Sequence, residues 1–139
     1  MTAREDYSIE LKDLTLGYGE RDIIAGLNLD VRRGEILSLL GPSGCGKTTT
    51  LHAIAGLISP RKGSVIIDGV DQTDVPINRR NVVMVFQGYA LFPHMTVFNN
   101  VSYGLRIKSV PKDQIRERVA RALKLVGMEA FAHRKPKEL

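Results

Sequence analysis

The stretch GPSGCGKTTT, residues Gly41 to Thr50, decides the fold, because it fits the pattern G-x-x-x-x-G-K-[ST] without a gap. A loop that holds phosphate needs backbone N–H groups that converge on the phosphate oxygens, and a Cβ atom would block that approach. Gly41, Gly44 and Gly46 remove the Cβ at these positions. A helix starting near Lys47 would add the positive end of its dipole. The stretch therefore predicts a phosphate-binding loop.

The side chains of this loop suit a nucleotide with a magnesium ion. The Lys47 ammonium can reach β and γ phosphates, which gives it a catalytic role. The Thr48 hydroxyl suits Mg²⁺, which keeps most of its octahedral shell as water and phosphate oxygen. Cys45 is interpreted as a small filler residue rather than a reactive thiol. The predicted nucleotide-binding residues of the loop are Gly41, Pro42, Ser43, Gly44, Cys45, Gly46, Lys47, Thr48 and Thr49.

The segments around the loop predict an α/β fold. Ile36–Leu40 and Val82–Phe86 are near-continuous apolar runs, typical of strands covered on both faces. Residues 47–55 predict a helix that Gly56 ends. Shorter alternating patterns predict further strands at residues 9–16 (with a slip after Leu11), 23–31 and 63–68.

Two more helices follow in the last third of the chain. Thr96 can cap a short helix through Val101. Lys112–Val126 has apolar residues spaced for one helix face, and Glu117 with Arg121 adds an i,i+4 ion pair. The order of elements favours a parallel core with an antiparallel β annex, followed by the start of a helical part.

Composition excludes several classes of protein. The 139 residues are 43% hydrophobic and 25% charged, which is typical of a modest globular chain. One cysteine allows no intrachain disulfide and fits a reducing compartment. No apolar run approaches the roughly 18 residues of a membrane span. The net charge of +5 comes from scattered basic pairs such as Arg79–Arg80, interpreted as solvated surface, so nucleic acid is not an expected partner.

Two blocks of the sequence resemble one family. They are GPSGCGKTTTLHAIAGL at residues 41–57 and MVFQGYALFPHMTVFNNVSYGLR at residues 84–106. From about Ile9 to Leu139 the chain resembles the ATP-binding subunit of an ABC transporter, of the importer group that energises uptake of polyamines, ferric iron, sugars and related solutes. The resemblance implies a P-loop NTPase fold of the ABC type, with ATP and Mg²⁺ as ligands.

The resemblance implies roles for residues outside the loop. Gln87 matches a glutamine that contacts Mg²⁺ and the attacking water, and an amide offers both a donor and an acceptor for this. It is therefore a catalytic residue and, with Thr48, a metal-site residue. Tyr18 matches an aromatic residue that stacks on adenine. The expected interface with the membrane subunit is an exposed apolar group made of Tyr89, Leu91, Phe92 and Met95.

The resemblance also implies an organisation and an expected limit. Residues 1–87 would form the nucleotide-binding core with its β annex, and residues 88–139 the transporter-facing loop with part of a helical subdomain. Asn99 stands where the family often has a glutamate, which weakens a capping box begun by Thr96. The family's signature, its acidic pair and its switch histidine are expected after Leu139. These 139 residues alone are therefore expected to bind nucleotide with negligible hydrolysis.

The implied partners are membrane-spanning permease subunits and, in the full-length family, a second copy of the subunit. The implied location is cytoplasmic, on the inner face of the cell membrane. Since the family adds later strands beside Ile36–Leu40, we expect that apolar strand to lie open at a sheet edge. Two alternatives remain open, an ABC-type ATPase acting on DNA or in translation, and an inactive structural fragment. The block YALFPHMTV favours the transporter.

Overall fold

The protein divides into two compact units in a computed structural model that describes residues 6–139. One unit ends at Met84 and the other begins at Val85, shortly before the division at Gln87 that the sequence suggested. Each unit has its own hydrophobic core. None of the helices within residues 6–139 is long and apolar enough to span a membrane.

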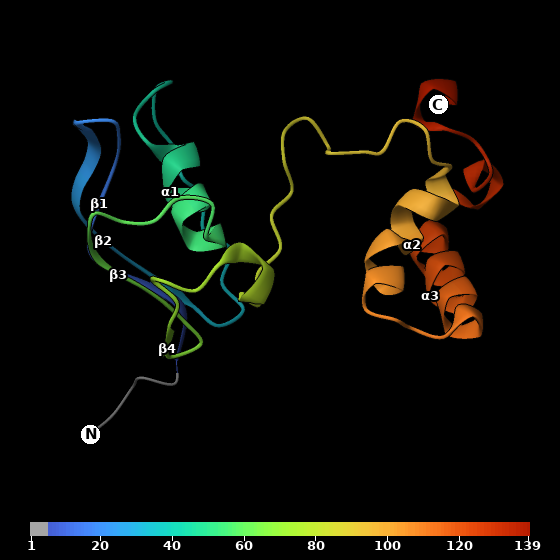
Figure 1. The fold of residues 1–139 in the computed structure, drawn as a ribbon, viewed down its shortest axis with the longest axis horizontal. Helices are drawn as coiled ribbons and strands as arrows, with labels where there is room; N and C mark the ends of the chain where they lie inside the picture. The colour runs from blue at the N-terminus through green and yellow to red at the C-terminus, as the bar shows by residue number, and fades with distance from the viewer. Residues whose placement is uncertain (1–5) are drawn as a thin grey trace. The chain divides into compact units, whose positions relative to one another are not determined.

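The first unit contains a four-stranded antiparallel sheet in the order β2-β1-β3-β4. Its strands are labelled in Figure 1. The strands are β1 (Tyr7–Tyr18), β2 (Arg21–Arg32), β3 (Lys62–Ile67) and β4 (Val70–Asp71). Tyr18 pairs with Arg21, so β1 and β2 form a hairpin with a tight turn at Gly19 and Glu20. The strands predicted at residues 9–16, 23–31 and 63–68 are confirmed.

The slip predicted in the first strand is a β-bulge. The register of β1 against β2 shifts between Leu11 and Leu14, and Asp13 adopts a φ of 48°. The bulge turns both leucines into the core. Gly63 passes beside it with a φ of 82°, and a Cβ at that position would lie 2.3 Å from the carbonyl oxygen of Lys12. Glycine is therefore required where β3 meets the bulge.

Helix α1 (Lys47–Ala55) packs on this sheet. It ends at Gly56, the stop signal predicted from the sequence, and this glycine adopts a left-handed conformation. Leucines of β1, aliphatic residues of β3 and one alanine of α1 are buried together. The buried core residues of the first unit are Leu11, Leu14, Leu16, Ala53, Val65 and Ile67.

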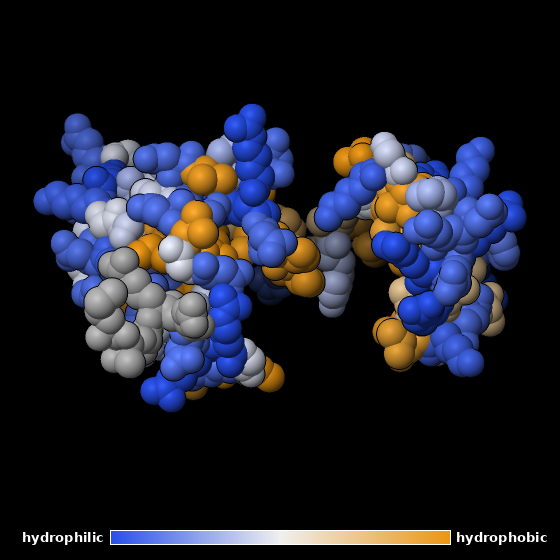
Figure 2. Space-filling view, turned by 90° about the horizontal axis from the view of Figure 1, so that it is seen from below, coloured by the Kyte–Doolittle hydropathy of each residue, from blue (hydrophilic) through white to orange (hydrophobic). Residues whose placement is uncertain are grey.

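The two predicted buried strands, Ile36–Leu40 and Val82–Phe86, are not strands in the structure. Every strand pairing within residues 6–139 is antiparallel, so the predicted parallel core is not formed among them, and Ile36–Leu40 is not a sheet edge. Ile36 is 94% exposed and Val83 is 95% exposed. The physical reason is that an extended segment becomes a strand only when a neighbour accepts its backbone hydrogen bonds. Figure 2 shows apolar side chains at the surface among polar ones.

The second unit is built from α2 (Val97–Ile107) and α3 (Lys112–Leu125). Thr96 caps α2 as predicted, because its Oγ1 accepts a hydrogen bond from the N–H of Asn99 at 3.2 Å. The helix runs beyond the predicted end at Val101, since Leu105 still packs on the core. The buried core residues of this unit are Val97, Ile115, Val119 and Leu123. Short 3₁₀ turns at Glu129–Phe131 and Pro136–Glu138 follow α3, and a further one at Ile77–Arg79 belongs to the first unit.

Candidate functional site: a phosphate-binding loop beside an exposed tyrosine

The loop Gly41–Gly46 leads directly into the start of α1. Gly46 is the N-cap residue of α1 and has a φ of 97°. A Cβ on Gly46 would lie 2.6 Å from the Cδ1 atom of Ile24, so glycine lets the loop pack closely on β2. No side chain caps α1, and its first turn has no acidic residue. The N–H groups at this helix start therefore favour an anion.

The Lys47 side chain lies over its own loop. Its Nζ atom donates hydrogen bonds to the carbonyl oxygens of Gly41 and Pro42, each at 2.7 Å, and lies 3.5 Å from the Cys45 Sγ atom. No carboxylate among residues 6–139 forms an ion pair with Lys47. The ammonium charge thus lies in the loop that leads to the start of α1, as the sequence pattern predicts for a phosphate site.

The three threonines that open α1 have different surroundings. Thr48 is exposed, so its hydroxyl can act as a ligand. Thr49 is buried, which leaves its backbone N–H as the group able to contact a nucleotide. Thr50 is also buried, and its Oγ1 donates to the carbonyl oxygen of Gly46 at 3.0 Å, which fixes the first turn.

The donor set fits a magnesium ion better than a zinc ion. Within residues 6–139 no group of three or more His, Cys, Asp or Glu side chains could hold a metal. Mg²⁺ needs only one or two protein oxygens when phosphate and water fill the remaining positions. The exposed Thr48 hydroxyl at the start of α1 meets that requirement.

Tyr18 and one residue of the phosphate loop, Gly44, line the same cavity, whereas Lys47 lines a neighbouring one. The cavity at Tyr18 has a volume of about 330 Å³, and its lining residues are Tyr18, Arg21, Asp22, Ile23 and Gly44. Tyr18 ends β1 and is 54% exposed, so its ring offers an accessible flat surface. Arg61 fixes the adjoining turn, because it pairs with Asp22 at 2.5 Å and donates to the carbonyl oxygen of Gly19. The structure thus brings together two features that the sequence predicted separately.

Gln87 belongs to the second unit, whereas the phosphate loop belongs to the first. It is exposed and begins a turn in which the N–H of Tyr89 donates to the carbonyl oxygen of Phe86 at 2.9 Å. Tyr89 and Ala90 both have left-handed backbones, with φ of 58° and 46°. This places a sharp bend directly after Gln87.

The predicted apolar interface is only partly exposed. Tyr89 and Leu91 are exposed, as expected, but Phe92 and Met95 are half-buried, which corrects the prediction. The Phe92 ring packs on Tyr103 with 4.6 Å between the ring centroids. The loop therefore turns half of its apolar group inward against α2.

Asn100 holds this loop in place, and sequence reasoning missed it. Its Oδ1 accepts a hydrogen bond from the N–H of Phe92 at 2.8 Å. Its Nδ2 donates to the carbonyl oxygens of Phe92, Met95 and Thr96 at 3.0–3.2 Å. The only sequence signal is a second asparagine after Thr96, which does not indicate which of the two side chains turns back toward the loop.

Arg80 is the second residue that sequence reasoning missed. The pair Arg79–Arg80 was interpreted as solvated surface, which is wrong for Arg80 because its side chain is buried. Its guanidinium donates to the carbonyl oxygens of Ala53 and Ile54 in α1, at 2.7 and 2.9 Å, and to those of Thr73 and Val75, at 3.1 and 2.7 Å. Burial lowers the pKa of Arg80, and the charge of Asp71 opposes that shift. Arg80 therefore ties the last turn of α1, the helix that carries Lys47, to the segment after β4.

The chain is similar to known ATP-binding proteins. Residues 24–139 match the family model described as ABC transporter. The chain is 51% identical over 131 residues to the spermidine/putrescine import ATP-binding protein PotA of Pasteurella multocida and 52% identical to PotA of Aggregatibacter actinomycetemcomitans. In both cases the match covers 94% of this chain and 35% of the relative. The chain thus spans about a third of the length of these relatives.

Solved structures give the same result for the fold. The ATP-binding cassette MJ0796, in a dimeric post-hydrolysis state bound to ADP and Pi, superposes with a TM-score of 0.81 at 33% identity, over 94% of this chain and 62% of that one. The protein cbiO1 of Clostridium perfringens, part of the ABC transporter complex cbiONQ, superposes with a TM-score of 0.82 at 29% identity, over 97% and 56%. A match at this level includes the strands β1 to β3, the loop and α1, so the fold is that of an ABC-type P-loop NTPase. The chain belongs to the ABC transporter family.

Proposed function

We propose that this chain supplies the nucleotide-binding part of an importer that couples ATP binding and hydrolysis to solute uptake. The observation that carries the proposal is the common location of a cationic phosphate loop and an exposed aromatic ring. Tyr18 and Gly44 line one cavity, and Lys47 lies over the same loop. This arrangement suits a ligand with a flat base at one end and phosphates at the other.

Each residue has a defined role in this proposal. Tyr18 stacks on adenine, and the loop from Gly41 to Thr49 surrounds the phosphates through its backbone N–H groups. Lys47 leaves the carbonyl oxygens of Gly41 and Pro42 and stabilises charge on the β and γ phosphates. Thr48 and Gln87 are the proposed Mg²⁺ contacts, and Gln87 also orients the attacking water. The ion would neutralise charge on the phosphate oxygens during transfer.

The proposed partners rest on the family and on the names of the relatives. Residues 1–87 would carry the nucleotide and residues 88–139 would contact the permease, with Tyr89 and Leu91 as the exposed apolar contacts and Phe92 and Met95 supporting them. Since relatives at 50–52% identity are named for spermidine and putrescine import, polyamines are the proposed solute class. A location on the cytoplasmic face of the cell membrane and pairing with a second subunit complete the proposal.

Titration of the 139-residue chain with a fluorescent ATP analogue tests the binding site. Lys47→Ala should weaken binding at least about tenfold, because a charge-assisted contact to phosphate is lost. Lys62→Ala is the matched control, because Lys62 is an exposed lysine at the start of β3 and lies outside the loop. Equal affinity for the wild-type chain and the Lys47→Ala variant would contradict the proposal.

A second measurement separates the base from the phosphates. Tyr18→Ala should weaken ATP binding by roughly three- to tenfold, whereas Tyr18→Phe should retain it, because stacking needs the ring and not the hydroxyl. Binding of inorganic triphosphate should be the same in both variants. With Mg-ATP, the 139-residue chain should show no steady turnover above its Lys47→Ala variant, because none of the residues proposed to bind the nucleotide or Mg²⁺ is a carboxylate that could polarise water.

A further inference from the structure

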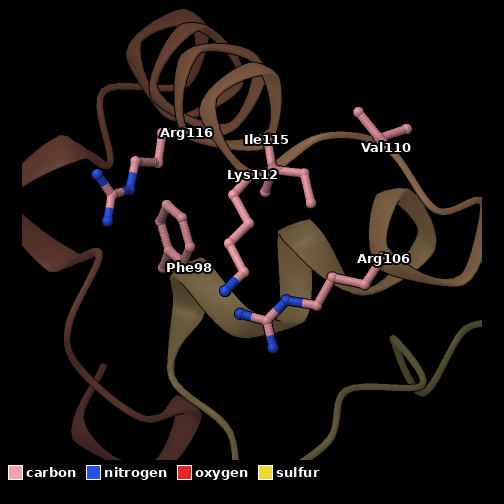
Figure 3. Close-up of a pocket in the computed structure, with 6 residues that line it drawn as sticks. All are labelled: Phe98, Arg106, Val110, Lys112, Ile115 and Arg116. Atoms are coloured by element: carbon pink, nitrogen blue, oxygen red, sulfur yellow. The ribbon is translucent and has the colours of Figure 1, made fainter.

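The second unit contains a cavity that the proposed function does not use. Its volume is about 570 Å³, which is within the usual range for small-molecule sites. It lies between α2, the connection that follows it and the first turns of α3 (Figure 3). Its lining residues are Phe98, Arg106, Val110, Lys112, Ile115 and Arg116. None of these residues belongs to the phosphate loop or to the apolar group after Gln87.

The polar lining of this cavity is entirely cationic. Arg106, Lys112 and Arg116 contribute three positive charges and the remaining lining residues contribute no charge. No carboxylate among residues 6–139 forms an ion pair with any of the three. Arg106 donates to the Asn99 Oδ1 at 2.6 Å, and because this acceptor is neutral the arginine charge remains uncompensated. The acidic residue of the same turn of α3 is Asp113, which does not line the cavity.

Two of the three cationic head groups, those of Arg106 and Lys112, approach one another in the cavity. In Figure 3 the Lys112 ammonium and the Arg106 guanidinium extend toward one another from α3 and α2. The Arg116 guanidinium lies on the other side of the Phe98 ring. Like charges held near a concave, partly apolar wall repel one another and attract an anion more strongly than scattered surface cations do. An ordinary solvated face would instead separate its cations or intersperse them with carboxylates.

The apolar lining of the cavity indicates that the ligand also has an apolar part. Phe98 is half-buried and presents its ring to the cavity, and Val110 and Ile115 add aliphatic walls. A planar body can stack on the Phe98 ring while its anionic groups contact the cations. A bare anion would leave these walls in contact with water. The lining therefore favours a ligand with both charge and apolar surface.

We propose that this cavity binds a small organic anion that carries at least two negative charges on an aromatic or apolar body. Arg106 and Lys112 hold one end of the ligand, Phe98 stacks on its body, and Arg116 contacts a second anionic group. The proposal is independent of the nucleotide site, because none of the lining residues is among those proposed to bind the nucleotide or Mg²⁺.

A chemical-shift titration of the ¹⁵N-labelled 139-residue chain tests this site with 1-naphthyl phosphate as the probe. Saturable shifts should appear at the amides of the lining residues, between Phe98 and Arg116. Inorganic phosphate and the neutral 1-naphthalenemethanol should each bind there at least roughly tenfold more weakly, since each lacks one half of the recognition. Any binding at the phosphate loop would appear separately at residues 41–50 and should disappear in the Lys47→Ala variant.

Two charge-matched double variants decide whether the lining cations are responsible. Lys112→Gln with Arg116→Gln should weaken naphthyl phosphate binding roughly tenfold. Arg118→Gln with Lys124→Gln removes the same charge from exposed positions of α3 outside the cavity, and should leave the affinity within about twofold of wild type. Equal losses in the two double variants, equal affinity for inorganic phosphate, or shifts that avoid the lining residues would each overturn the proposal.

Discussion

Two apolar stretches of the first unit differ in whether their side chains are buried. Leu14 in β1 is 0% exposed, whereas Leu40, in a run that looks equally strand-like, is 91% exposed. The difference lies in the backbone. β1 has β2 on one side and β3 on the other, while residues 36–40 pair with no strand within residues 6–139. An apolar run thus indicates that a segment needs cover, and a strand forms only where a neighbour supplies hydrogen bonds.

The largest expected effect comes from the substitution of leucine by alanine, made once in the buried stretch and once in the exposed one. Leu14→Ala should lower the free energy of unfolding by about 2–5 kcal/mol, because it opens a cavity in a closed core. Leu40→Ala removes the same atoms from an exposed position and should change the free energy of unfolding by less than about 0.5 kcal/mol. Urea denaturation followed by circular dichroism measures both. Similar losses for the two variants would show that residues 36–40 are covered in solution.

Arg80 stabilises the first unit through one side chain that donates to four backbone carbonyl oxygens. Arg80→Met should lower the free energy of unfolding of the first unit by about 2–3 kcal/mol, because buried carbonyl oxygens of α1 lose their charged donor. Arg80→Lys should recover only part of this lost stability, since an ammonium cannot contact all four carbonyl oxygens.

Arg79→Met is the control for Arg80, because Arg79 is exposed and adjacent. Its unfolding curve should overlay that of the wild-type chain. If the Arg79 and Arg80 variants were equally stable, the guanidinium contacts with α1 would have no energetic role.

In the second unit the Asn100 side chain forms hydrogen bonds with several backbone groups, as the Arg80 side chain does in the first unit. Asn100→Ala should destabilise the loop of residues 88–96 by about 1–2 kcal/mol, because one side chain satisfies four backbone groups there. Faster amide hydrogen exchange at Phe92 measures the effect, since its N–H donates to this side chain. Asn99→Ala is the matched control, because the Asn99 side chain contacts Arg106 instead. Unchanged exchange at Phe92 in the Asn100→Ala variant would exclude Asn100 as the residue that orders this loop.

The smallest expected effect concerns the turn after β4. The hydroxyl and N–H groups of Thr73 donate to Asp71 and hold the pKa of its carboxyl below the ordinary value. The charged form is thus favoured in the folded state, so its contribution is present above about pH 4 and is lost as the pH falls through the folded pKa.

Asp71→Asn should abolish that contribution. The difference in unfolding free energy between wild type and this variant should shrink as the pH falls from about 6 toward 3. The neighbouring exposed Asp74→Asn serves as the comparison, with no such convergence expected. A difference independent of pH would show that the Thr73 contacts do not favour the charged carboxylate.

Local patterns in the sequence predicted several features whose cause is local, although the end of α2 and the short 3₁₀ turns were missed. The bulge near Asp13, the hairpin, the ends of α1 and the cap at Thr96 follow from alternation, turn residues and glycine. The phosphate loop was predicted from its spacing, its glycines and the elements expected around it, and the structure adds that Tyr18 shares a cavity with Gly44. The two residues that were missed, Arg80 and Asn100, act through side-chain contacts to backbone groups, over 4–8 positions for Asn100 and up to 27 for Arg80. Arg80 contacts Ala53 across 27 positions, and no periodicity of the chain encodes such a contact.

The contact between Lys47 and its own loop has a consequence for the thermodynamics of ligand binding. The ammonium already has two carbonyl partners, so phosphate binding is an exchange reaction in which one set of acceptors displaces another. The observed affinity then measures the difference between phosphate and carbonyl oxygens as partners. Weak acceptors such as sulfate monoesters should lose that competition, while a triphosphate, with more charge for the same ammonium, should win it.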